Sequence, residues 1–316
     1  MKLPIFLAGA AFAGAVLAQS YPDRPVKLIV PFPPGGSNDV VARVIGGQLT
    51  AKLGQSVFIE NRAGAGGTIG INAAAASAPD GYTLLLVSVG YPVSIALGAM
   101  PLDSLKSFAP VGSLGTGPSI LVVPVSLPVR TTQDLVALAK RKPGSLNAGS
   151  AGLGSFQHLA TELFRLRAGI DIVIVQYKGG GPALTDTIAG QVHMNVGSVV
   201  QNLPHVRSGK LKALGIGGAK RLATLPDVPT FAESGIEGAE ANNWWGIVVP
   251  AGTPQPIIAR LQQDIDAVLA MPETQKRFEL EGSEVMHMAP ADFGRHMAEE
   301  TVRWTRVVKQ ANIKAE

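Results

Sequence analysis

Short apolar runs alternate along the chain with stretches whose apolar residues recur every three or four positions. The first run, Val26–Val30, ends at Pro31 and predicts a buried strand. Residues 38–53 follow with apolar side chains on one helical face, which predicts an amphipathic helix. The same alternation predicts strands at 57–60 and 83–87 and a helix at 68–76. Alternating strands and helices of this kind favour a mostly parallel sheet covered by helices.

The alternation then resumes and ends in helices. Further strands are expected at 120–123, 172–176, 194–196 and 211–216, with helices at 132–142, 155–167, 182–189, 254–270, 272–281 and 290–312. A chain of roughly 300 residues exceeds one comfortable core, so two α/β domains are expected. Two strand-like stretches, near Ile120–Val125 and Trp245–Pro250, would carry the chain to the second domain and back. The segments are then 19–124 and 247–316 for the first domain and 125–246 for the second.

The first residues predict a secretory signal peptide. Lys2 precedes an apolar stretch at 3–17, and small Ala18 stands before Gln19, where cleavage is expected. A membrane anchor would need about 20 apolar residues, and this stretch is shorter. The chain contains no Cys, so it can carry neither a lipid-anchoring cysteine nor a disulfide. We therefore expect an exported protein that is stabilised by its core alone.

Composition and charge narrow the function. The 37 Gly and 23 Pro residues accompany 46% hydrophobic residues, which favours a packed globule over disorder. Removing residues 1–18 removes only the charge of Lys2, so the net charge falls from +4 to +3. The basic residues are scattered, whereas a nucleic-acid-binding protein concentrates them on one face. Anionic small molecules are therefore favoured over nucleic acid, and no spacing of His and acidic residues predicts a metal site.

Two Gly-rich loops lie where predicted strands pass into helices. The loop 31–39 contains Gly35-Gly36-Ser37-Asn38-Asp39, and the loop 63–70 contains Gly64, Gly66 and Gly67. Unpaired N–H groups and the helix dipole make such a helix start suitable for an anion. The second loop departs from the G-x-G-x-x-G spacing and from the P-loop, which argues against a nucleotide. An ordinary strand-to-helix turn is the alternative for each loop taken alone.

A third Gly-rich loop raises the question of catalysis. Residues 148–152 differ by one residue from the G-x-S-x-G pattern of serine hydrolases, with Ser150 as the candidate nucleophile. His158 follows too early for the usual order of the triad, and several glycines separate Ser150 from the next helix. A secreted hydrolase therefore stays an alternative, but a carboxylate-binding loop is favoured. A fourth Gly-rich turn, Tyr177–Pro182, contains Lys178, which would face either an acidic ligand or solvent.

Together these stretches resemble the extracytoplasmic receptors of tripartite tricarboxylate transporters, known as Bug-type receptors. The segments that carry the resemblance follow one another in family order along nearly the whole mature chain. They are PFPPGGSNDVVAR (31–43), ENRAGAGGTIG (60–70), PDGYTLL (79–85), FAPVGSL (108–114), GSAGLGSFQHLATELF (149–164), YKGGGPALTDTIAGQV (177–192), LPDVPTFAESG (225–235) and WWGIVVPAGTP (244–254).

The resemblance implies a fold and a function. The fold is α/β, like that of type II periplasmic binding proteins, with two α/β lobes joined by crossing strands. The function is capture of a small carboxylate, di- or tricarboxylate or aromatic acid, and its delivery to the integral-membrane subunits of a transporter, without catalysis, metal or cofactor, by a monomer. Presentation of the ligand to a sensor kinase is the alternative. The resemblance places ligand contacts at Phe32, Gly36, Ser37, Asn38, Asp39, Gly66, Gly67, Thr68 and Ser88 of the first lobe and at Ser150, Gly152, Ser155 and Ser198 of the second.

The chain departs from the family pattern in the second lobe. Ala148 stands where the family usually has an aromatic residue, and acidic residues often found near His193 and near Ser198 are missing. Gln176 stands where a proline commonly precedes the tyrosine motif. These departures imply a roomier and less negative cleft, and hence a ligand without a free amino group.

Overall fold

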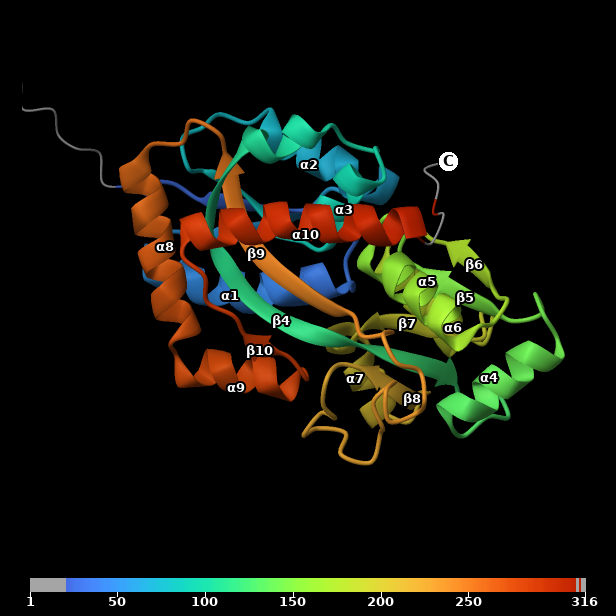
Figure 1. The fold of residues 1–316 in the computed structure, drawn as a ribbon. Coiled ribbons are helices and arrows are strands. Elements are labelled where there is room, and N and C mark those ends of the chain that lie inside the picture. Colours follow the sequence, from blue (N-terminus) through green and yellow to red (C-terminus); the bar gives the residue numbers. More distant parts are fainter. Residues whose placement is uncertain (1–20, 311–312, 314–316) are drawn as a thin grey trace, which may run out of the picture.

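A computed structural model of the chain describes residues 21–310 and residue 313 (Figure 1). The predicted signal peptide and its cleavage site after Ala18 lie outside the described residues, as do the last two residues of the helix predicted at 290–312. Among the described helices, none has both the length and the apolar character needed to cross a membrane.

The first lobe begins with three parallel strands, β1 (Val26–Val30), β2 (Val57–Asn61) and β3 (Thr83–Ser88), with β1 in the middle. Both faces of β1 are covered, since Leu28 and Ile29 belong to hydrophobic clusters on opposite sides. Burial on both faces explains why this strand is a continuous apolar run. Helices α1 (Ser37–Leu53) and α2 (Thr68–Ala75) follow β1 and β2, with a short 3₁₀ turn, η1 (Ala65–Gly67), between β2 and α2.

Two long antiparallel strands, β4 (Phe108–Pro124) and β9 (Asn242–Pro250), join the lobes. Phe108 to Pro118 of β4 pair with β9, and Ser119 to Pro124 pair with strands of the second lobe. The expectation of two crossing strands is thus confirmed, but β4 begins at Phe108 rather than near Ile120. Glycines and prolines between residues 110 and 118 interrupt its apolar pattern and hide its first half from sequence reasoning.

The expectation of a mostly parallel sheet is wrong. The strand order is β10-β4-β9-β3-β1-β2, with two more strands paired to β4, and only β1 pairs with its neighbours in parallel. The crossing strands run antiparallel to β3 and to each other, so they turn a parallel βαβα start into a mixed sheet. Alternation of strands and helices predicted the parallel part only.

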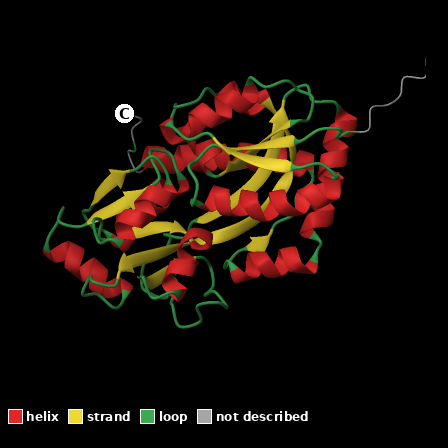
Figure 2. Ribbon diagram, turned by 180° about the vertical axis from the view of Figure 1, so that it is seen from behind, coloured by secondary structure: helices red, strands yellow, loops and turns green. Residues whose placement is uncertain are grey.

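The second lobe contains a small parallel pair of strands and the end of β4 (Figure 2). Its elements are α4 (Thr132–Arg141), β5 (Asn147–Ser150), α5 (Phe156–Ala168), β6 (Val173–Gln176), α6 (Gly180–Ile188), β7 (Asn195–Ser198), α7 (Val199–Arg207) and β8 (Leu211–Gly217). Strand β5 and helix α7 were not predicted. The segment limits 19–124, 125–246 and 247–316 stay a prediction, since β4 pairs with strands of both lobes.

The C-terminal helices return to the first lobe. They are α8 (Gln255–Leu269), α9 (Pro272–Leu280) and α10 (Pro290–Gln310), with the short strand β10 (Glu284–Val285) paired to β4. Short elements after β3, namely α3 (Gly90–Ala96) and η2 (Leu102–Ser107), complete this lobe. Figure 1 shows α10 lying across the crossing strands toward the second lobe.

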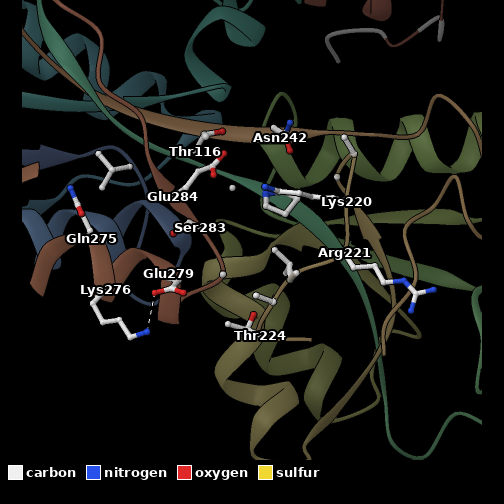
Figure 3. A pocket seen from close by; sticks show the side chains of 18 of the residues that line it. Thr116, Lys220, Arg221, Thr224, Asn242, Gln275, Lys276, Glu279, Ser283 and Glu284 are labelled. Atoms are coloured by element: carbon white, nitrogen blue, oxygen red, sulfur yellow. Dashed lines mark hydrogen bonds and ion pairs between the residues drawn. The ribbon is translucent and has the colours of Figure 1, made fainter. Parts of the chain in front are cut away.

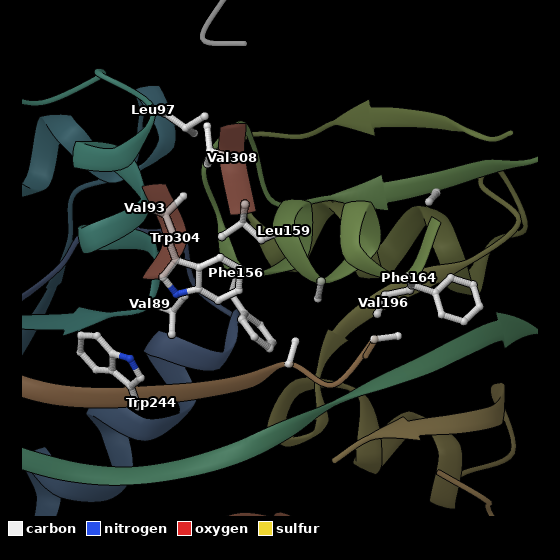
Figure 4. Packing of buried hydrophobic residues seen from close by; sticks show 14 of the residues in the cluster. Val89, Val93, Leu97, Phe156, Leu159, Phe164, Val196, Trp244, Trp304 and Val308 are labelled. Atoms are coloured by element: carbon white, nitrogen blue, oxygen red, sulfur yellow. The ribbon is translucent and has the colours of Figure 1, made fainter. Parts of the chain in front are cut away.

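One buried carboxylate on helix α10 connects this helix to the crossing strand β9. Both indole N–H groups of Trp244 and Trp304 donate to the same oxygen of Glu300, at 3.2 and 2.9 Å. Glu300 is buried, and its other oxygen accepts from Arg303. The two indoles belong to a hydrophobic cluster that extends to Phe156 and Leu159 of α5 (Figure 4). The core therefore continues from the first lobe into the second.

We expect Glu300→Ala to lower the free energy of unfolding by about 2–4 kcal/mol, because it leaves two buried indole donors without an acceptor. Glu299→Ala is the matched control, since Glu299 is exposed on the same helix turn and should change little. Urea unfolding followed by tryptophan fluorescence measures both. Equal stability of the two variants would show that the carboxylate does not fasten α10.

Candidate functional site

The loop between β1 and α1 is held in shape by the carboxylate of Asp39. It accepts from the Gly35 N–H, from the side chain of Asn61 at 3.0 Å, and from the guanidinium of Arg43 at 2.9 Å. Burial acts to raise the pKa of Asp39, but the hydrogen bonds from Arg43, Asn61 and Gly35 outweigh it and leave this pKa below its ordinary value. Asp39 is thus fully engaged by groups of the loop, of α1 and of β2, and it fixes the start of α1.

Behind that helix start, a chain of side chains links β9 to β3. The indole N–H of Trp245 donates to Oδ1 of Asn38 at 3.0 Å, and Nδ2 of Asn38 donates to Oγ of Ser88 at 3.2 Å. An indole can only donate, so it fixes which end of the Asn38 amide faces Ser88. Ser88 then accepts from Asn38, and its own hydroxyl hydrogen is available to another acceptor.

On the second lobe, Ser155 caps α5. Its Oγ accepts from the backbone N–H of His158 at 3.2 Å and lies 3.5 Å from Oγ of Ser150. Nδ1 of His158 accepts from the Gly154 N–H at 3.2 Å. The Ser150 hydroxyl therefore contacts a second serine, and Nδ1 of His158 holds the loop through the Gly154 N–H.

Two glutamines connect α5, α6 and α7. Nε2 of Gln201 donates to the carbonyl oxygen of Gly180 at 2.6 Å, and Nε2 of Gln157 donates to Oε1 of Gln201 at 3.1 Å. Both side chains are buried, each with 4% of its surface exposed. A carbonyl only accepts, so the Gly180 oxygen fixes the orientation of Gln201 and, through it, that of Gln157.

A small cavity of about 30 Å³ lies between the lobes, and several of these groups line it. Its lining residues are Phe32, Gly36, Ser37, Asn38, Ser88, Ala151, Ser155, Phe156, Gln157, Gly180, Gln201 and Asn243. The starts of α1, α5 and α6 all meet there, and they bring unpaired backbone N–H groups and the positive ends of three helix dipoles. None of these lining residues carries a charged side chain. The cavity is therefore suited to an anion that is held by hydrogen-bond donors rather than by a counter-ion.

The structure brings part of the predicted site together. Six predicted contacts line the cavity: Phe32, Gly36, Ser37, Asn38, Ser88 and Ser155. The other predicted contacts do not line it: Asp39, Gly66, Gly67, Thr68, Ser150, Gly152 and Ser198. Ala148 lies in the hydrophobic core and does not line the cavity. Its small side chain therefore does not enlarge this cavity, contrary to the prediction. Gly197 precedes Ser198, near which the family often has an acidic residue. Here the side chains nearest to Gly197 are those of Gln157, Asn195 and Asn202.

Three glycines, Gly66, Gly179 and Gly181, lie where the lobes touch. A Cβ on Gly66 would lie 2.6 Å from the carbonyl oxygen of Leu153 in the other lobe. A Cβ on Gly179 would lie 2.2 Å from the Pro33 ring, and one on Gly181 would lie 2.6 Å from the Pro34 oxygen. Distances this short exclude a side chain, so at these glycines the backbone of one lobe lies directly against the other lobe in this closed arrangement.

Sequence reasoning missed Gln157, Gln201 and Asn243. Single amides within helix or strand patterns belong to no motif, and only the fold brings them to one cavity. A weak signal existed for Gln157, which stands two residues after the helix-capping Ser155. Asn243 shares a face of β9 with Trp245, because alternate residues of a strand point the same way.

A much larger hollow, of about 870 Å³, lies beside the crossing strands (Figure 3). Its lining includes Thr116 and Asn242 from the crossing strands, Lys220 from the second lobe and Glu284 from the first. Lys276 and Glu279 at its edge form an exposed ion pair at 2.9 Å. Its charges are of both signs, and the helix starts described above lie elsewhere, so we regard the small cavity as the candidate site.

The fold and the cleft define a two-lobed solute-binding protein. Residues 41–313 match the family model of the tripartite tricarboxylate transporter family receptor. BugT of Bordetella pertussis (strain Tohama I / ATCC BAA-589 / NCTC 13251) is 41% identical over 313 residues, which cover 98% of this chain and 96% of BugT. The chain belongs to this receptor family, whose members are periplasmic.

Solved structures agree with this assignment. Rpa4515 of R. palustris, solved with adipate, is 35% identical and superposes with a TM-score of 0.90, over 93% of this chain and 99% of that one. MatC of Rhodopseudomonas palustris, solved with bound malate, is 33% identical with a TM-score of 0.86, over 91% of this chain and 100% of that one. The expected fold of two α/β lobes joined by crossing strands is confirmed.

The loop at Ser150–Ser155 should make stability depend on pH through His158. Burial holds the pKa of His158 below its ordinary value of 6.5, and nearby Glu162 opposes this only in part. Below pH 6.5 the unfolded chain therefore binds a proton that the folded protein does not, so the free energy of unfolding falls as the pH is lowered. We expect His158→Gln to show a smaller fall.

Urea unfolding of both proteins at pH values between about 5 and 8 measures this difference. The variant should keep part of the fall, because burial and Lys210 also lower the pKa of His205. Identical pH profiles for the two proteins would contradict the assignment to His158.

Proposed function

We propose that this protein is a periplasmic receptor that captures a small carboxylate between its lobes and delivers it to the integral-membrane subunits of a tripartite tricarboxylate-type transporter. The observation that carries the proposal is the meeting of three helix starts at a cavity lined by neutral side chains. Helix N-termini bind anions through free N–H groups and the dipole. In this proposal the signal peptide is removed near Ala18 and the receptor acts as a monomer.

The donors of the first lobe would hold the carboxylate. Ser88 has a hydroxyl hydrogen to donate, Asn38 offers its second amide hydrogen, and the backbone N–H groups of Ser37 and Asn38 begin α1. Asp39 would act from behind, by fixing the loop, since its charge is balanced by Arg43. Gly36 and Phe32 complete this wall of the cavity. A set of donors of this kind stabilises a carboxylate without a buried cation.

The second lobe would complete the site by closure. Ser155 lines the cavity, whereas Ser150, Gly152 and Ser198 do not. The closed cavity of about 30 Å³ is much smaller than usual ligand pockets of roughly 300–1,000 Å³. Ligand entry therefore requires the lobes to separate about the crossing strands and to close less completely around the bound acid. The bonds of Ser150 and His158 support binding rather than hydrolysis.

We expect the mature protein to gain thermal stability from particular mono-, di- or tricarboxylates or aromatic acids. A ligand that binds only the folded state adds about 2.7 kcal/mol at a hundred times its Kd. Ser88→Ala should lower the affinity for the acid by about tenfold, because it removes one hydrogen-bond donor to a charged group. Ser56→Ala is the matched control, since Ser56 is exposed and lies far along the sequence from the loop. A broad panel of acids in which none shifts Tm would overturn the proposal.

Closure itself can be tested with glycine variants. Gly181→Ala places a Cβ against the Pro34 oxygen of the other lobe, so it should disfavour the empty, fully closed arrangement more than the less closed, liganded one and strengthen ligand binding on the order of tenfold. Gly181 is helical, so its own lobe should fold normally. Gly47→Ala is the control: Gly47 lies in α1 with nothing near its Cβ, and the change should raise stability by about 0.5–1 kcal/mol without affecting affinity. Calorimetric titration with a bound acid measures affinity, and equal values would contradict closure at Gly181.

A further inference from the structure

The two glutamines of the second lobe present a fixed arrangement to the cavity. The Gly180 carbonyl accepts from Gln201, whose Oε1 accepts from Nε2 of Gln157. This order of donors and acceptors leaves no freedom to exchange the oxygen and nitrogen of either amide. Gln157 therefore keeps Oε1 as the free end of its side chain, in a residue that lines the cavity.

That free end is an acceptor without a donor. Oε1 of Gln157 is buried and has no hydrogen-bond partner among the described residues, and the same is true of Oδ1 of Asn243. Asn243 also lines the cavity and has only 1% of its surface exposed. A buried polar atom left unpaired costs about 1–3 kcal/mol, so a group that donates to it is strongly favoured. Asn195, Ser198 and Asn202 also carry unpartnered atoms, but they do not line the cavity.

The surroundings select the kind of donor. An ammonium group would meet the positive ends of three helix dipoles, and no carboxylate lines the cavity to balance its charge. A hydroxyl group brings a donor without a positive charge. It also accepts, so it can use the N–H groups that begin α5 and α6 on its other side.

We propose that Gln157, oriented by Gln201 and assisted by Asn243, recognises a hydroxyl group on the bound acid, so that the receptor prefers hydroxylated carboxylates to their plain analogues. This rests on the proposed function and deepens it by naming the substrate class. Gln157 and Asn243 are the contacts, and Gln201 is a positioning residue. A site built to bond a hydroxyl rejects the analogue that lacks it, because the buried partner is then left unpaired.

The test uses pairs of acids that differ by one hydroxyl. The pairs are succinate and malate, glutarate and 2-hydroxyglutarate, tricarballylate and citrate, and benzoate and its hydroxylated forms, with both enantiomers of malate and of 2-hydroxyglutarate. Calorimetric titration of the mature protein gives Kd for each. We expect at least one hydroxy acid to bind about tenfold or more tightly than its plain partner, and a chiral hydroxy acid to bind with a preference for one enantiomer.

Variants locate the preference. Gln157→Leu should bring the Kd values of each pair together, mainly by weakening the hydroxy acid, while Gln191→Leu, an exposed change in the same lobe, should keep them apart. Gln201→Leu frees the Gln157 amide to turn, so it should reduce the preference between enantiomers more than the affinity for the plain acid. Circular dichroism and Tm confirm that each variant is folded. If Gln157→Leu does not fold, Gln201→Leu and Asn243→Ala carry the same test.

The outcomes separate the two proposals. Binding of plain acids with equal affinity for their hydroxylated partners would overturn the hydroxyl preference and leave the carboxylate receptor standing. A preference that survives in Gln157→Leu would overturn the role of Gln157. Absence of binding by every acid in the panel would overturn the proposed function and this inference with it.

Discussion

The antiparallel register of β3 and β9 is the constraint on which the site depends, because it places Ser88 opposite Trp245. Trp245 orients Asn38, and Asn38 in turn hydrogen-bonds Ser88, so one register connects two strands and the start of α1. The same strand brings Asn243 to the cavity and turns Trp244 the other way, toward Glu300 on α10. A shift of one residue would move each of these side chains to the opposite face of the sheet.

The site uses neutral groups to bind an anion. The charged groups nearby are paired with one another, so they do not repel it. Asp39 lies in the first turn of α1, where a free carboxylate would repel an anion at the same helix end. Its oxygens accept from Arg43, Asn61 and Gly35, of which Arg43 balances its charge, and it becomes a structural support for the loop. At this helix start the anion then meets hydrogen-bond donors and no free carboxylate. Binding without a buried cation also avoids leaving an unpaired buried charge when the ligand leaves.

Sequence reasoning recovered the parts of the fold that depend on local pattern. Helices such as α1 and α8 and strands such as β1 and β3 follow from apolar periodicity, and the first two Gly-rich loops follow from turn chemistry. It failed where the role of a residue depends on partners that are distant in the sequence. Nothing near Gln157 in the sequence indicates that Gln201 and Gly180 fix its amide, and Gly115 and Gly117 conceal that β4 is one long strand. The role of Asp39 was also expected to be direct contact, since its partners Arg43 and Asn61 are known only from the fold.

The glycines show how the same residue type serves two purposes in this receptor. At Gly36 the missing side chain leaves room for a ligand beside exposed N–H groups, whereas at Gly66, Gly179 and Gly181 it lets the two lobes touch. Backbone contact sets a hard limit to closure, because no side chain can yield there. A ligand that fills the cavity must hold the lobes slightly apart, and it then exchanges some of these contacts for its own. Affinity in such a cleft therefore depends on the difference in free energy between the empty and the liganded closed arrangements. Small changes at the glycines then alter the affinity for a ligand that these residues do not contact.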